Sequence, residues 1–157
     1  MKDLIDYIIA LLETNLVPTR GIKKVYWGDP IMIAGAYMPC IAVDGDKTNT
    51  EVADSANDED TYGMSISVIL NAQNWMGQSD GAKNAKKELM AMMEERNTNG
   101  TRMSDTVLQI ARTELLKKSN VLSVTGATVD YGFRERKDTI TVEAICRFVV
   151  RCTPYLR

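Results

Sequence analysis

The chain has 157 residues, of which 45% are hydrophobic and 25% charged, and its formal net charge is -2 at pH 7. This length and composition are typical of one globular domain, and they exclude a low-complexity or membrane-spanning chain. There is no histidine, which removes the usual general base, the commonest transition-metal ligand and the Ser-His and Cys-His nucleophile pairs. Carboxylates and lysines remain as catalytic groups, but the composition favours a protein that is not an enzyme.

The first predicted element is an amphipathic helix over residues 3–16. Apolar side chains recur there at steps of three and four residues, which places them on one face. Pro18 is expected to end this helix, because proline cannot continue it. A short strand over 22–27 follows, and the turn residues 28–30 (Gly-Asp-Pro) end it. The apolar face of the helix therefore needs a sheet on which to pack.

Two further strands are predicted at 40–43 and 64–70, on either side of an acidic stretch. The segment 31–43 is apolar and β-prone, and Pro39 favours an edge position or the entry to the strand. Residues 64–70 alternate between apolar and polar, as in a strand with one buried face. The acidic stretch between the two strands, residues 44–62, is therefore expected to be a long loop.

Two helices are predicted in the middle of the chain. The first begins at Gly81, with Ser79 or Asp80 as its cap, and the polar segment 97–100 ends it. The second spans 104–118, with its first residue, a serine, as the N-cap and two lysines at its negative end. Both helices carry an apolar stripe that predicts packing against the sheet.

The last third of the chain has the clearest strand pattern. A strand is predicted over 121–133, with a bulge at Gly126, followed by a charged turn over 134–138. In the final strand every second residue from Ile140 to Cys152 is apolar, and the other parity carries Thr, Glu and Arg. This alternation predicts a long antiparallel strand with one buried face, paired with its predecessor as a hairpin.

The order of predicted elements is α, β, β, β, α, α, β, β. Runs of strands separated by helices predict an α+β fold with a mostly antiparallel sheet, helices packed on one face and a long C-terminal β-hairpin. No linker or internal repeat divides the sequence. We therefore expect a single α+β domain over residues 1–157.

The acidic stretch holds seven of the 21 acidic residues and one of the 19 basic residues, so the remainder carries 18 bases against 14 acids. An EF-hand calcium-binding loop needs Gly at its sixth position and Glu at its twelfth. A loop that begins at Asp44 has Asn49 and Ser55 at these positions, and a loop that begins at Asp58 has Ile69 at the twelfth, so neither frame fits. We interpret it as a surface at a subunit contact or channel, with a plain solvated loop as the alternative. Its acids are Asp44, Asp46, Glu51, Asp54, Asp58, Glu59 and Asp60.

No motif indicates a catalytic, cofactor or metal site. The chain lacks a phosphate loop, a dinucleotide-binding glycine pattern, a CxxC pair and a GxSxG elbow. Cys40, Cys146 and Cys152 are odd in number and have no paired spacing, which favours reduced thiols that fill the core. We expect no cofactor and no bound metal.

Other residues are candidates for an interface with a partner. A polar loop presents an aromatic and a methionine side chain, which are favoured interface anchors, although the tryptophan can equally cover the edge of the core. Basic residues lie at the hairpin turn and on the outward parity of the last strand. The candidates are Trp75, Met76, Arg134, Arg136, Lys137, Arg147 and Arg151.

Several short motifs follow one another in a recognisable order. An N-terminal helix and a strand with a "GDP" turn precede "MPCIAV", a long polar segment, "YGMSISVIL", a helix with "RMSDTVLQIARTELLKK" and a β-hairpin. Over nearly the whole chain this order resembles the tail terminator (tail completion) proteins of long-tailed bacteriophages and related head-to-tail joining proteins. The resemblance rests on architecture and short apolar patterns.

The resemblance implies a structural virion protein that forms a homohexameric ring on the end of the tail tube. Such a ring stops tube polymerisation and binds the head connector, so its partners are its own copies, the tail tube protein and a neck protein. It implies a location in the tail or neck of the virion, assembly in the host cytoplasm, no membrane, and DNA that only passes through the channel. Acids lining that channel would repel the DNA phosphates.

Alternative functions remain open at this point. Within virions, another neck, head-completion or baseplate protein of similar fold fits the same pattern. From a different class, a small metal-binding module or a carboxylate-based enzyme would use the acids of residues 44–60, but the missing histidine and the failed EF-hand frames argue against it. A third class is a monomeric host adaptor domain.

Overall fold

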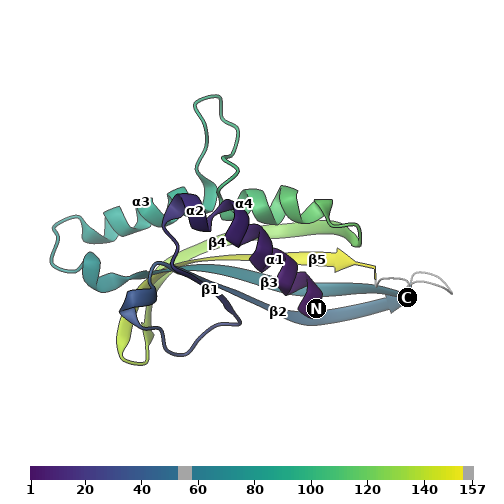
Figure 1. Cartoon of the computed structure of the whole chain (residues 1–157), viewed down its shortest axis with the longest axis horizontal. Helices are drawn as coiled ribbons and strands as arrows, with labels where there is room; N and C mark the ends of the chain where they lie inside the picture. The colour runs from purple at the N-terminus through teal and green to yellow at the C-terminus, as the bar shows by residue number, and fades with distance from the viewer. Residues whose placement is uncertain (53–57, 154–157) are drawn as a thin grey trace.

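A mixed five-stranded sheet forms the centre of the fold, with its strands in the order β1-β2-β3-β5-β4 (Figure 1). The computed structural model describes residues 1–52 and 58–153 of the chain. β1 runs parallel to β2, and every other neighbouring pair is antiparallel. The strands are β1 (Lys24–Trp27), β2 (Cys40–Val52), β3 (Asp58–Asn71), β4 (Val121–Arg136) and β5 (Thr139–Cys152).

Helices cover one face of this sheet (Figure 1). A continuous helical segment over 107–117, here called the 107–117 segment, changes its winding twice along its length. The predicted α+β class, with a mostly antiparallel sheet, helices on one face and a C-terminal hairpin, is confirmed. The helices are α1 (Lys2–Asn15), α2 (Val17–Arg20), α3 (Gly81–Glu94) and α4 (Val107–Gln109), with a π turn at Ile110–Glu114 and 3-10 turns at Gly35–Tyr37, Ala72–Asn74 and Leu115–Lys117.

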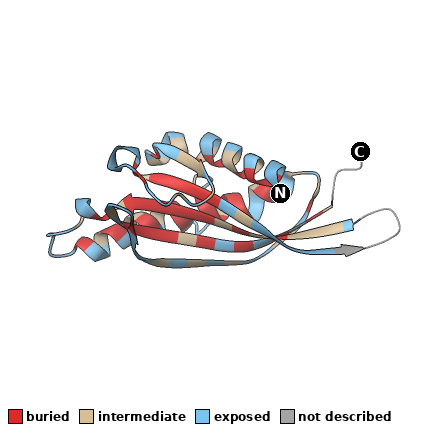
Figure 2. Ribbon diagram, turned by 90° about the horizontal axis from the view of Figure 1, so that it is seen from below, coloured by how far each residue is buried: buried red, intermediate tan, exposed pale blue. Residues whose placement is uncertain are grey.

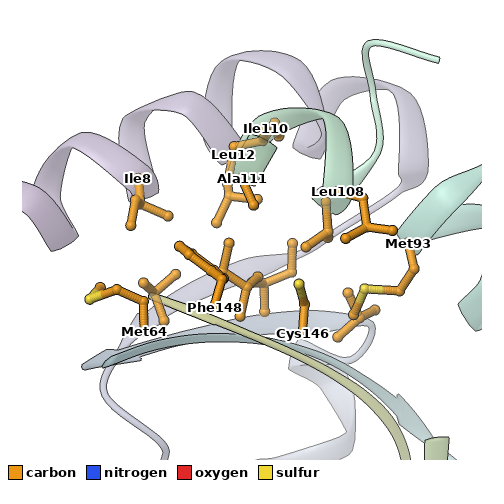
Figure 3. Packing of buried hydrophobic residues seen from close by; sticks show 14 of the residues in the cluster. Ile8, Leu12, Met64, Met93, Leu108, Ile110, Ala111, Cys146 and Phe148 are labelled. Carbon is orange, nitrogen blue, oxygen red and sulfur yellow. The ribbon is translucent and has the colours of Figure 1, made fainter. Parts of the chain in front are cut away.

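The main hydrophobic core lies between the helices and the sheet. α1 points Ile8 and Leu12 toward the strands, and the 107–117 segment adds Leu108 (Figure 3). Phe148 and Cys146 of β5 face them from the sheet, because alternate residues of a strand share one face. Burial of each large apolar side chain stabilises the fold by about 1.5–3 kcal/mol, so this layer holds the helices in place.

A smaller core lies on the opposite face of the sheet, under the segment 28–39, here called the strap. Ile33 and Met38 of the strap are buried against Cys40, Ala42 and Ile69 of the sheet. The strap covers one end of this face and leaves the other end open. We refer to the uncovered part as the open face.

Two details of the helices differ from the predictions. The 107–117 segment begins after Thr106, whose hydroxyl donates to the carbonyl of Met103 at 2.8 Å, so Ser104 is not its N-cap. Pro18 lies in the first turn of α2 and α1 already ends at Asn15. A proline is tolerated there because the first N–H groups of a helix have no helical partner.

The C-terminal hairpin is confirmed, with a longer first strand than predicted. β4 continues to Arg136, and the turn contains only Lys137 and Asp138. The predicted bulge at Gly126 is present as a register shift, and its φ of 67° suits a residue without a Cβ. Ile140 was predicted to face the core, but it is 42% exposed because it lies at the end of the hairpin.

Candidate assembly surfaces

The acidic stretch forms a β-hairpin, and the prediction of a loop was wrong. β2 and β3 pair from Cys40 opposite Ile69 to Val52 opposite Asp58, with one register shift after Lys47. Backbone hydrogen bonds form a ladder whatever the polarity of the side chains, so a polar sequence can continue a strand. The hairpin extends beyond the helices, where its described residues are exposed or half-buried apart from Tyr62, which is buried (Figures 1 and 2).

We call residues 44–52 and 58–62 the acidic hairpin. Asp54 lies outside the described residues, and the side chain of Glu51 is likewise not described. Lys47 forms an ion pair with Asp60 at 2.8 Å, and Arg151 of β5 pairs with Glu59. Among the described residues, Asp44, Asp46 and Asp58 have no ion pair and are exposed, so the hairpin keeps an excess of negative charge.

Asp60 is the best-connected acid of the hairpin. The hydrogen bond from Lys47 lowers the pKa of Asp60 below its usual 3.8, and hydrogen bonds from Thr50 at 2.9 Å and Tyr62 at 3.0 Å act in the same direction. Burial and the neighbouring carboxylate raise the pKa of Tyr62 to about 12. This network joins the two strands of the acidic hairpin, while Asp44, Asp46 and Asp58 remain exposed.

Replacing Asp60 with asparagine is expected to lower the free energy of unfolding at pH 7 by about 1 kcal/mol or less. Because the folded-state pKa is depressed, the contribution of Asp60 is present above about pH 4 and is lost as the pH falls through the folded-state value. Urea unfolding of both proteins at pH 7 and pH 3 measures this. A stability difference that grows toward low pH would contradict the assigned direction.

A shallow groove of about 390 Å³ crosses the open face beside the acidic hairpin. Asp44 and Asp46 lie on one side of it, and Arg147 lies on the other, where it pairs with Asp130 at 2.7 Å. Gly63, between these sides, adds no side chain above the sheet. Across the described residues, no group of three or more His, Cys, Asp or Glu side chains is placed to hold a metal ion.

Arg136 was predicted to be an exposed interface residue, and this prediction is wrong. It lies 5% exposed under the strap, where it pairs with Glu143 at 2.6 Å and Asp29 at 2.9 Å and donates to the carbonyl of Pro30. Glu143 is also buried, although its parity predicted an exposed position. Arg134 is exposed and pairs with Asp29 at 2.6 Å. These residues hold the strap on the sheet.

The remaining interface candidates have different positions. Trp75 is half-buried against the helix-side core, as the alternative reading expected, and Met76 is 61% exposed. Lys137 is exposed in the hairpin turn, and Arg151 is exposed on β5. Met76 follows β3 in the connection to α3.

The cysteines are buried. Burial raises the pKa of the Cys40 thiol to about 12 and that of Cys146 to about 11, and it also raises the pKa of Cys152. A thiol with a raised pKa holds little reactive thiolate at neutral pH. These side chains therefore pack as small apolar groups.

Both edges of the sheet lack a strand partner over long stretches of the described chain. β1 covers β2 only from Cys40 to Val43, so β2 is free beyond this point. β4 forms the other edge over its full length, and residues 121–129 contain no charged side chain. Unpaired strand edges are templates for pairing with another chain.

Sequence reasoning missed a projecting arm at residues 95–103, which rises from the helices (Figure 1). Arg96 and Arg102 pair across it in an isolated antiparallel bridge. At its base Arg20 pairs with Glu95 at 2.6 Å and Asp105 at 3.0 Å. The only signal in the sequence was the turn-rich segment 97–100, which was interpreted as the end of a helix.

No protein-family model and no curated protein matches the chain. Among the described residues, no helix is long and apolar enough to cross a membrane. The fold and its surfaces are therefore the basis for a functional assignment.

Proposed function

We propose that the chain is a structural virion subunit that forms a homohexameric ring on the end of a bacteriophage tail tube and joins it to the neck. The observation that carries the proposal is the pair of free sheet edges. β4 and the distal half of β2 lie at opposite sides of one sheet. Two different edges on one subunit suit a head-to-tail contact, which closes into a ring when the rotation per subunit permits.

The character of the two edges supports this proposal. The uncharged run at 121–129 would be a liability on a monomer, because natural edge strands are commonly blunted by charges. A neighbouring copy that pairs with this run removes the liability. The bulge at Gly126 adds local twist, which suits a curved assembly.

The open face and the hairpins give the subunit its other contacts in this proposal. A ring on a tube needs one surface for the tube and another for the neck. The strap end presents exposed apolar side chains, including Ile31 and Met32, and the opposite end presents the acidic hairpin. The role is one of assembly, with no catalytic step.

The test is the solution mass of the purified chain, measured by light scattering over a range of concentrations. The wild-type chain is expected to form a closed hexamer. Thr125→Lys places a charge on the exposed β4 edge and is expected to shift the mass toward the monomer. Ser79→Lys adds the same charge in the connection before α3 and serves as the control. A wild-type monomer at every concentration would contradict the ring.

A further inference from the structure

Three arginines lie together where the arm meets the edge of the helix layer, and among the described residues none has an ion pair. Arg96 and Arg102 oppose each other on the arm, and Arg112 comes from the π turn of the 107–117 segment. We call them the arginine cluster. Each of the other described arginines pairs with a carboxylate: Arg20, Arg134, Arg136, Arg147 and Arg151.

The cluster has an unbalanced positive charge. Burial lowers the pKa of Arg102, and the charges of Arg96 and Arg112 lower it further. The Nε atom of Arg102 is buried and has no hydrogen-bond partner among the described residues. The charge of Glu94 acts in the opposite direction, and the two acids at the base of the arm, Glu95 and Asp105, are paired with Arg20. Like charges that face each other destabilise a strand pair, and a buried donor without a partner adds to this cost.

The arginine side chains are held in position by backbone contacts. Arg96 Nη1 donates to the carbonyl of Gly100 at 2.8 Å, which fixes it along the arm. Arg112 Nη2 donates to the carbonyl of Ala127, in the bulge of β4, at 3.3 Å. A single π turn redirects the side chains that follow it and is frequent at functional sites. Two guanidiniums of the cluster are therefore held in place, and that of Arg112 lies beside the free β4 edge.

We propose that the arginine cluster binds the acidic hairpin of a second copy of the chain. The proposal rests on the assembly described under the proposed function and assigns one of its contacts. The acidic stretch holds seven carboxylates against one lysine, and Asp58 near its end is exposed without an ion pair. Guanidinium groups bind carboxylates through paired, charge-assisted hydrogen bonds. The chain thus carries a projecting anionic segment and a separate cationic receptor.

The size of the cluster favours this partner over nucleic acid. A nucleic-acid surface needs basic groups spread along a phosphate backbone. Here the charges of Arg96, Arg112 and Glu94 all act on Arg102, so the basic groups lie within one short stretch of surface, on a chain with net charge -2. One short acidic segment matches this arrangement.

The experiment uses full-length variants that lose one side of the contact each. The receptor variant is Arg96→Gln with Arg112→Gln, and the hairpin variant is Asp46→Lys with Asp58→Lys, all at exposed positions. Lys83→Gln with Lys87→Gln, exposed on α3, removes the same charge as the receptor variant and is its control. Circular dichroism and thermal unfolding establish that each variant is folded.

Sedimentation velocity is expected to show that both variants associate at least about tenfold more weakly than the wild type and the lysine control. An equimolar mixture of the two variants is expected to form dimers that do not grow, because one intact contact remains per pair. These results support the contact.

Several results would overturn it. If the receptor variant assembles like the wild type, the proposed contact is wrong, but the proposed ring is not contradicted. The same conclusion follows if the mixture of the two variants stays monomeric. A wild-type chain that remains monomeric contradicts both the contact and the ring. Salt-sensitive binding of a short DNA duplex, measured by fluorescence anisotropy and lost in the receptor variant, assigns the cluster to nucleic acid instead.

Discussion

Replacing Glu143 with alanine is expected to lower the free energy of unfolding by about 3 kcal/mol. Glu143 and Arg136 form a buried ion pair at 2.6 Å, and the hydroxyl of Thr141 donates to the same carboxylate at 2.6 Å. The substitution leaves the Arg136 guanidinium buried beside only the half-exposed Asp29, and removing one member of a buried pair leaves an uncompensated charge. Urea unfolding at neutral pH measures the loss.

Two further variants distinguish the effect of the unpaired Arg136 charge from the effect of losing a side chain. Glu135→Ala, at an exposed neighbour of Arg136 in β4, is expected to change stability by less than about 0.5 kcal/mol. Glu143→Met with Arg136→Met removes both charges together and is expected to recover most of the loss. If the double variant is as unstable as Glu143→Ala, the unpaired buried charge is not the cause.

Replacing Phe148 with alanine is expected to lower the free energy of unfolding by about 3–5 kcal/mol. Phe148 is 2% exposed on the helix side of β5, beneath Ile8 and Leu12 of α1 (Figure 3). The substitution removes the transfer free energy of the ring and leaves a cavity between the two layers. Chemical denaturation measures this change in the free energy of unfolding, provided that the slope of the free energy against denaturant concentration is the same for both proteins.

The adjacent residue provides a matched control for this measurement. Val149 follows Phe148 in β5, points to the open face and is 39% exposed. Val149→Ala is expected to lower the free energy of unfolding by less than about 1 kcal/mol, because this partly exposed side chain buries little apolar surface on folding. Equal losses at the two positions would show that β5 does not bury one parity against the helices.

The parts of the fold that were predicted from the sequence are those that local periodicity determines. α1 and α3 each carry an apolar stripe at helical spacing, and β5 alternates over most of its length. Such patterns reflect burial against whichever layer lies opposite, so they identify an element without knowledge of its partner. The alternation also predicted the final hairpin correctly, and the glycine within the strand pattern predicted the bulge at Gly126.

The acidic hairpin and the strap depend on contacts that a linear pattern does not contain. Cross-strand bonds, such as that between Thr50 and Asp60, continue the β2–β3 ladder through a polar sequence. Arg136 was placed in a charged turn, although it is buried because the strap, about 100 residues earlier in the sequence, folds over it. A distant segment determines burial there.

The arginine cluster was missed for a related reason. Arg96 and Arg102 lie on a segment that had been interpreted as the end of a helix, and Arg112 comes from the π turn of a different segment. In the sequence their charges were scattered among other basic residues. The fold brings these three together and pairs the other described arginines with carboxylates.

Electron microscopy of the purified wild-type chain is the most direct test of the central claim, that this is a ring-forming tail subunit. Class averages are expected to show a closed ring of six copies, with β4 of each subunit beside the distal half of β2 in the next. Open filaments, or single particles of the monomer at concentrations well above those of assembly in the cell, would contradict the account.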